Sequence, residues 1–181
     1  EDADKQTFNE VFMKSFRLMP FEYASCEEIG ENADFKEFME KAEKQFNNIK
    51  RVVLHDMPAN GFDVSSCMLE PSFFCEKYGF QGRLDLLQLS DKKDGTDRII
   101  ELKSGKTPFP QNDVTKIALN HETQTAIYRM MIQCVFDKDA RHIFPNILYS
   151  AADNSGENIR FAAVYQQLEK EIVNARNLIV A

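Results

Sequence analysis

Hydrophobic residues recur at helical spacing in the first third of the chain. Between residues 5 and 18, large apolar side chains repeat about every 3.6 residues, which predicts a helix. A longer apolar stripe runs through residues 34–56, and Asp34 followed by Glu37 is typical of a capping box at a helix start. Pro58 then predicts the end of this second helix.

The pattern changes to short β-type runs over residues 62–103. Three runs, "FDVSSCMLE", "FQGRLDLLQLS" and "DRIIELK", are separated by the turn-rich segments "PSFFCEKYG" and "DKKDGTD". Residues 104–113 form a loop, because two prolines there prevent regular pairing. The rest predicts a helix over 114–137, strands at "FPNILYS" and "NIRFAAVY", and a closing helix over 164–179. This order predicts a mixed α/β or α+β domain with one central sheet between helices.

Length and composition are those of an ordinary globular domain. The 181 residues are 43% hydrophobic and 28% charged, enough to bury a core. No apolar stretch approaches the ~20 residues that span a bilayer, and the acidic amino-terminal segment is not a signal peptide. Four widely separated cysteines indicate free thiols rather than a disulfide framework. We therefore expect a cytoplasmic location and no membrane partner.

The ends of the chain predict a wider context. The chain begins at Glu1 without a methionine and ends in the apolar run "NLIVA". No internal repeat or interdomain linker divides it. We expect residues 1–181 to form a single domain that is part of a larger multidomain protein.

The charge distribution is uneven along the chain. The net charge of −7 argues against unspecific binding to nucleic acid, and residues 1–50 alone carry a net charge of −5. Residues 77–116 carry a net charge of +2. This segment can therefore hold a local site for a polyanion.

Three charged side chains lie inside the apolar runs, where burial is costly unless they are paired or bind a metal. Residues two apart in a strand share a face, so Glu101 and Lys103 project together. If "GRLDLL" pairs with "IIELK" through the turn "DKKDGTD", Asp85 reaches Glu101 on that face. Glu70, in the preceding run, is a third acid that can approach the same place.

Two adjacent carboxylates repel each other unless a cation lies between them. Such oxygen ligands favour Mg²⁺ or Mn²⁺, which can bind a phosphate oxygen and acidify a water. Lys103 can orient the attacking water or stabilise the developing negative charge. The arrangement predicts hydrolysis of a phosphodiester. The alternative is an ordinary cross-strand salt bridge between Glu101 and Lys103 on a solvated face.

The helix after the proline loop carries polar residues within an apolar sequence. His121, Gln124 and Tyr128 fall on one stripe of this helix, beside apolar neighbours. On a core face, a polar stripe of this kind would lose its hydrogen bonds to water, which is unfavourable. Over a metal site, it could hydrogen-bond a phosphate backbone and the lysine.

These motifs resemble the PD-(D/E)XK nuclease superfamily, and specifically its RecB-like branch, whose pattern is GxxD, then (D/E)xK, then QxxxY. The matches are "GRLD" (82–85), "ELK" (101–103) and "QTAIY" (124–128). The fuller string over residues 70–133 looks most like the nuclease domain of flap-processing helicase-nucleases of DNA replication. The resemblance implies a restriction-endonuclease-like core, with a central mixed sheet flanked by helices.

The resemblance implies a metal site. Asp85 and Glu101 would bind the divalent metal, Mg²⁺ or Mn²⁺, with the Leu102 carbonyl as a further ligand. Glu70 is the additional candidate ligand that the order of the strands suggests.

The resemblance also implies the other roles. Lys103 would be the catalytic lysine, and Gln124 and Tyr128 would support the site and the DNA backbone. Candidates for DNA contacts are Arg83, Lys106 and His121. The alternative for the loop cations is that they are simply solvated.

The sequence departs from the relatives in two respects. The branch commonly has a histidine metal ligand on a helix upstream of GxxD, whereas His55 is interpreted as a helix-end histidine. Some relatives carry an iron–sulfur cluster with three late cysteines, a group that this chain lacks, so no iron–sulfur cluster is expected here. The string "SGKT" imitates a nucleotide-binding P-loop, but Ile100 stands where that motif needs glycine.

The sequence therefore predicts a metal-dependent DNA nuclease domain. It would act on single-stranded or branched DNA in repair or replication, with a helicase domain in the same chain or a partner chain. One alternative is a nuclease fold kept as a weakly catalytic DNA-binding or scaffolding module. Another is a structural α/β domain in which the motif arises by chance.

Overall fold

Five strands form the central sheet in the order β1-β4-β5-β6-β7. The computed structural model describes residues 4–29, 34–110, 113–152, 156 and 158–180. The strands are β1 (Met68–Leu69), β4 (Leu86–Gln88), β5 (Asp97–Lys103), β6 (Ile143–Tyr149) and β7 (Ile159–Phe161). Only β5 and β6 pair in parallel, so the sheet is mixed, as predicted.

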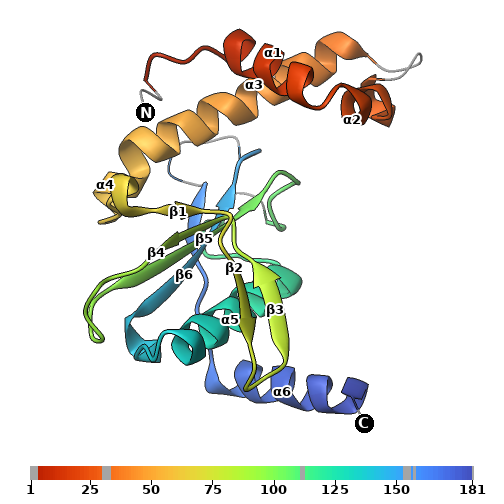
Figure 1. Cartoon of the computed structure of the whole chain (residues 1–181). Helices are drawn as coiled ribbons and strands as arrows, with labels where there is room; N and C mark the ends of the chain where they lie inside the picture. Colours follow the sequence, from red (N-terminus) through yellow and green to blue (C-terminus); the bar gives the residue numbers. More distant parts are fainter. Residues whose placement is uncertain (1–3, 30–33, 111–112, 153–155, 157, 181) are drawn as a thin grey trace.

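Helices cover both faces of this sheet (Figure 1). Helix α5 (Leu119–Val135) is the crossover between the parallel strands β5 and β6, a connection that parallel pairing requires. Ile99 points to the α5 face, where it joins the core cluster that includes Leu87 and Met131. Ile100 points to the opposite face and packs in a second cluster. Strand geometry alternates the faces in this way.

The opposite face is covered by the carboxyl end of one continuous helical stretch, because Ile49, Val52 and Met57 pack in the same cluster as Ile100. The stretch consists of α3 (Phe35–Arg51), the π-helical turn η2 (Val52–Asp56) and α4 (Met57–Ala59). Asp34 caps its start by accepting hydrogen bonds from the backbone N–H groups of Lys36 and Glu37. This confirms one half of the predicted capping box, since the Glu37 carboxylate pairs with Lys41. The π-helical turn was not expected from the sequence.

Three further helices complete the fold. Helix α1 (Phe8–Leu18) begins with a capping box between Thr7 and Glu10, and the short helix α2 (Pro20–Ala24) follows it. Helix α6 (Gln166–Val180) packs on α5 at the far side of the molecule from α1 (Figure 1). Short 3-10 turns are η1 (Glu27–Ile29), η3 (Val64–Ser66) and η4 (Ala140–His142).

A second, two-stranded sheet is the main difference from the sequence prediction. Strand β2 (Ser72–Cys75) pairs with β3 (Phe80–Arg83), so the expected turn-rich segment "PSFFCEKYG" is a turn only at residues 76–79. The prediction of one strand over "FQGRLDLLQLS" is wrong, because the chain leaves this hairpin and enters the central sheet at Leu84 and Asp85. Burial of Cys75 and Leu84 in the α5-side cluster fixes the hairpin in place.

The segment 62–69 is less extended than predicted. The Asp63 side chain accepts a hydrogen bond from the Ser65 N–H, and this favours a 3-10 turn, so only Met68–Leu69 is a strand. None of the four cysteines forms a disulfide in the part of the chain that the structure describes, which includes all of them. Among the helices of the described segments, none is long and apolar enough to cross a membrane.

A buried ion pair lies at the other end of β5 from the predicted site. Asp97 is fully buried and its Oδ1 lies 3.3 Å from the Lys138 Nζ. Lys138 also donates to the backbone carbonyls of Ser90 and Lys92. Removing one partner of such a pair leaves an uncompensated buried charge, so this contact supports the fold.

Candidate active site

Asp85 and Glu101 lie on opposing positions of adjacent antiparallel strands. Asp85 directly precedes β4, and the pairing of Leu86 with Ile100 places it opposite Glu101, on the face that α5 covers. Its Oδ2 accepts a hydrogen bond of 2.6 Å from the Leu102 N–H. Both acids therefore lie where β4 begins and β5 continues to Lys103.

The Glu101 carboxylate is buried, and among the described residues only one of its two oxygens accepts hydrogen bonds. The residue is 5% exposed, and its Oε1 accepts hydrogen bonds from Lys103 Nζ at 2.9 Å and Gln124 Nε2 at 2.6 Å. Its Oε2 has no hydrogen-bond partner among the described residues. Burial raises the pKa of Glu101, and the Asp85 charge raises it further, against the opposing effect of Lys103. Among the described residues, Oε2 is therefore the carboxylate oxygen left without a donor or a cation in direct contact.

Lys103 is held between a strand and a helix. Its Nζ donates to Glu101 Oε1 and, at 2.7 Å, to Gln124 Oε1. An ammonium has three donors, so one remains for a further acceptor. The lysine is thus fixed in orientation but still able to contact a substrate or a water.

The polar stripe of α5 lies across the strands, as the spacing of its residues suggested. Gln124 Nε2 also donates to the Tyr128 hydroxyl at 3.0 Å, and Tyr128 donates to the Arg83 carbonyl at 2.9 Å. A Cβ atom at Gly82 would lie 2.8 Å from Tyr128 Cε1. The glycine of the "GRLD" motif is therefore needed for the close approach of the tyrosine ring.

His121, the first residue of the stripe, contacts a residue that the sequence analysis missed. Its Nδ1 lies 2.9 Å from the hydroxyl of Tyr149, at the end of β6. Tyr149 pairs in register with Lys103 on the neighbouring strand. Burial and the Lys103 charge lower the pKa of His121. The sequence does show Tyr149 as a polar aromatic residue at the end of an apolar strand. It does not show that this strand pairs with β5 in the register that places Tyr149 beside Lys103.

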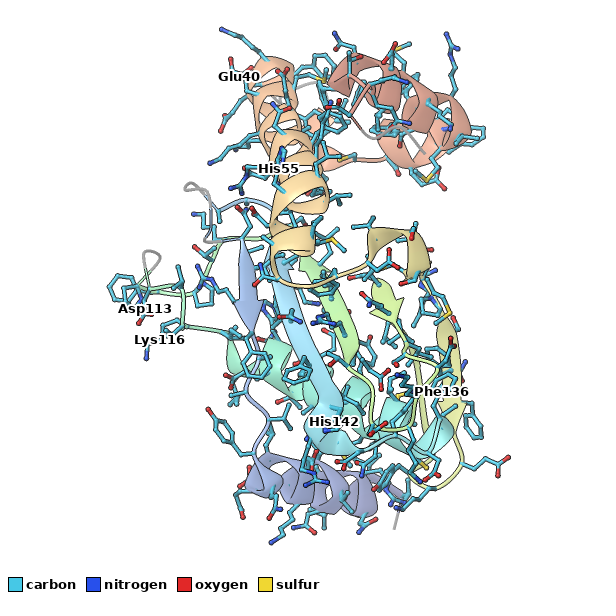
Figure 2. The ribbon with its side chains drawn as sticks, turned by 90° about the vertical axis from the view of Figure 1, so that its left-hand side faces the viewer. Glu40, His55, Asp113, Lys116, Phe136 and His142 are labelled. Atoms are coloured by element: carbon cyan, nitrogen blue, oxygen red, sulfur yellow. The ribbon has the colours of Figure 1, made fainter. Side chains whose placement is uncertain are left out.

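Two of the remaining predicted residues, Glu70 and Arg83, adjoin Asp85 in the chain or through its backbone, and the third is Lys106. The Glu70 backbone N–H bonds the Asp85 carbonyl at 3.0 Å, but its exposed carboxylate lies 3.6 Å from the Arg83 guanidinium. Lys106 is exposed on the loop after β5. Figure 2 shows Asp113 and Lys116 further along this segment, at the edge of the molecule. The roles of these residues stay predictions.

His55 is exposed in the π-helical turn and does not end a helix, because α4 follows directly (Figure 2). Within the described segments, no group of three or more histidine, cysteine, aspartate or glutamate side chains could hold a metal ion. The carboxylate donors at the centre are therefore Asp85 and Glu101.

These donors fit a small divalent cation. The orphaned Glu101 Oε2 and the opposing Asp85 carboxylate supply hard oxygen ligands. The N–H and C=O of one strand residue face the same neighbour, so the Leu102 carbonyl points to the Asp85 side. Mg²⁺ commonly binds through one or two carboxylates, with waters and substrate phosphates as its other ligands.

Comparisons with known proteins agree with this geometry. The model of the PD-(D/E)XK nuclease superfamily matches residues 4–178. A solved structure from Eubacterium rectale, described as a "Putative exonuclease", is similar with 13% identity and a TM-score of 0.51. The match covers 94% of this chain and 59% of that one, so this chain spans about three fifths of its length and the likeness concerns the fold. No curated protein matches the sequence.

The superfamily typically uses a divalent metal, and its members act on nucleic acids. The mixed sheet between helices is consistent with the restriction-endonuclease-like core of these enzymes, as expected from the motifs. Because the family match covers nearly the whole chain, the protein belongs to the PD-(D/E)XK nuclease superfamily.

Proposed function

We propose that the domain is a Mg²⁺- or Mn²⁺-dependent deoxyribonuclease that hydrolyses phosphodiester bonds in single-stranded or branched DNA. The observation that carries this proposal is the Glu101 carboxylate. One of its oxygens is buried without a partner among the residues that the structure describes, opposite Asp85, while the other is hydrogen-bonded to Lys103. A purely structural salt bridge would not need a second carboxylate at this place.

Each residue has a distinct task in this proposal. Asp85, Glu101 and the Leu102 carbonyl would hold the cation, which when bound supplies a Lewis acid and a water of lowered pKa. Lys103 directs its remaining donor at the attacking water or at the phosphate oxygen that gains charge. Gln124 orients Lys103 through a hydrogen bond of 2.7 Å and is itself fixed by Tyr128.

The surrounding cations would guide the DNA backbone. Arg83, at the end of β3, and Lys106, on the loop after β5, are exposed and can contact phosphates. His121 faces the same centre from α5. Glu70 could join the metal ligands only after leaving its contact with Arg83.

The wider setting follows from the motif resemblance. The "GRLD", "ELK" and "QTAIY" motifs support membership of the RecB-like branch, near the flap-processing helicase-nucleases. We propose a single nuclease domain of a larger cytoplasmic protein, working with a helicase domain in the same or a partner chain during repair or replication.

The test is cleavage of end-labelled single-stranded and flapped DNA in Mg²⁺ or Mn²⁺. Asp85→Ala, Glu101→Ala and Lys103→Ala should each abolish cleavage while the protein remains folded by circular dichroism. Lys36→Ala, on an exposed surface of α3, is the matched control and should cleave like the parent. Parent-like cleavage by all three site variants would disprove the assignment.

A second candidate is a nuclease fold that binds DNA but cleaves weakly. It is favoured by the finding that, among the described residues, no third histidine, cysteine, aspartate or glutamate joins Asp85 and Glu101 in a group that could hold a metal ion. This function predicts saturable, salt-sensitive DNA binding without cleavage in either Mg²⁺ or Mn²⁺. Metal-dependent cleavage that Asp85→Ala and Glu101→Ala abolish would exclude it.

A further inference from the structure

Tyr149 and His121 form a polar contact beside the candidate catalytic lysine. Tyr149 and Lys103 are register partners on parallel strands, so their side chains share the face that α5 covers. His121 lies one turn before Gln124, which binds Lys103. The His121 ring and the Lys103 ammonium therefore border the same space.

The hydrogen bonds of the Tyr149 hydroxyl fix the position of its proton. The Ala118 backbone N–H points at this oxygen from 3.4 Å, and a backbone N–H can only donate. Tyr149 is fully buried, so its own proton needs an acceptor. Among the residues that the structure describes, His121 Nδ1 at 2.9 Å is the acceptor within reach. Burial raises the pKa of Tyr149, which keeps the hydroxyl protonated.

This arrangement selects one tautomer of His121. An imidazole that accepts at Nδ1 carries its proton on Nε2. Burial and Lys103 lower the pKa of His121, so the ring stays neutral near neutral pH. Among the described residues, the hydrogen bond of this ring is the one at Nδ1, and the ring is half-buried, so the Nε2–H can donate to a ligand.

Arg160 fixes the tyrosine from the other side. Its guanidinium lies 4.9 Å from the centre of the Tyr149 ring and is 1% exposed as a residue. It also donates to the Lys116 carbonyl at 2.6 Å, on the segment that leads into α5. The tyrosine therefore has little freedom to turn away from His121.

We propose that His121 donates its Nε2–H to a phosphate oxygen of the DNA strand beside Lys103, and that Tyr149 is the positioning residue that sets this tautomer. The inference rests on the proposed nuclease function. A neutral donor and the third donor of the lysine ammonium together suit a non-bridging phosphate oxygen. The neutral imidazole adds a donor without adding a second positive charge beside the lysine.

The first test is the nitrogen NMR spectrum of the histidine side chains. The chain has 3 histidines, so a His121→Asn spectrum assigns the relevant signals. We expect His121 to carry its proton on Nε2, and we expect an oligothymidylate added in chelating buffer to shift the Nε2 resonance. Tyr149→Phe should give a mixture of tautomers. A proton on Nδ1 in the parent, or no response of Nε2 to the oligonucleotide, would overturn the inference.

The second test is the kinetics of cleavage. His121→Ala should lower kcat about 100-fold, the effect of losing one oriented donor. Tyr149→Phe should lower it about tenfold, the effect of losing a supporting contact, with a smaller change in KM. His121→Gln, which can present an N–H near the Nε2 position, should recover part of the loss. Tyr165→Phe removes a hydroxyl from an exposed tyrosine and should change nothing.

The two proposals can fail separately. If the parent protein cleaves no DNA, the proposed nuclease function is wrong, and the response of Nε2 to the oligonucleotide still decides the role of His121. If the parent cleaves DNA and Tyr149→Phe keeps both its tautomer and its kcat, the positioning role of Tyr149 is wrong while the nuclease function stands.

Discussion

Binding of a divalent cation should stabilise the fold through Glu101. In the metal-free protein, one oxygen of this 5% exposed carboxylate has no partner, and Asp85 lies opposite. The change to test is Glu101→Gln, which keeps the shape and one acceptor for Lys103 but removes the charge. We expect Mn²⁺ to raise the melting temperature of the parent and to have almost no effect on the variant.

The magnitude follows from the strand geometry. Side chains directly opposite on antiparallel strands are about 5 Å apart. Two unit charges at about 5 Å repel each other by about 3 kcal/mol at an effective dielectric constant of about 20. A cation present at about 100 times its Kd stabilises the folded state by about 2.7 kcal/mol, a comparable amount. For a chain of this size, that corresponds to a rise in Tm of about 5–10 °C.

The assay is thermal unfolding by circular dichroism with and without Mn²⁺, together with calorimetric titration. Without metal, Glu101→Gln should unfold within about 1 kcal/mol of the parent, because the repulsion with Asp85 disappears as the charged hydrogen bonds weaken. Glu169→Gln is the matched control, since Glu169 pairs with Arg129 away from the site at 2.5 Å. It should keep the full Mn²⁺ response. A full response in Glu101→Gln would refute the reasoning.

Further outcomes follow from single contacts. The pKa of Glu101 is raised in the folded state, so the folded protein binds the carboxyl proton more tightly than the unfolded chain. In metal-free buffer, the free energy of unfolding of the parent should therefore fall as pH rises from the usual carboxyl pKa through the raised pKa of Glu101. Denaturant unfolding of Glu101→Gln should lack this pH-dependent loss. Gly82→Ala should cost about 1–3 kcal/mol in the same assay, since its Cβ would lie 2.8 Å from the Tyr128 ring. Lys138→Met should cost about 3–5 kcal/mol by leaving Asp97 buried without its cation, and cleavage per folded molecule should not change.

The relation of Asp85 to Glu101 could be predicted because it depends on local rules. The period of two in a strand and an Asp-Gly turn are sufficient to bring the two residues together across β4 and β5. The stripe on α5 followed from helical spacing alone, and the structure places Gln124 within hydrogen-bond distance of Glu101, Lys103 and Tyr128.

Features that depend on distant pairings could not be predicted in this way. Tyr149 is 46 positions beyond Lys103, and only the parallel register of β5 and β6 makes them neighbours. The apolar run around Leu84 is divided between two sheets, with β3 in the small sheet and β4 in the central one. The alternation of apolar and polar residues does not show where such a run is divided. The turn residues at 76–79 concealed the hairpin of β2 and β3, because its strands are only 4 residues long.

Asp85 occupies the junction where the chain passes from the small hairpin into the main sheet. Its carboxylate accepts a hydrogen bond from the Leu102 N–H of β5. The chain before it belongs to β3, where the Arg83 carbonyl accepts a hydrogen bond from Tyr128 of α5. The spacing of the two acids therefore depends on how the hairpin joins the main sheet. A ligand that moves β2 and β3 should then change the affinity of the two acids for a cation, and by thermodynamic reciprocity a bound cation should change the affinity for that ligand by the same factor.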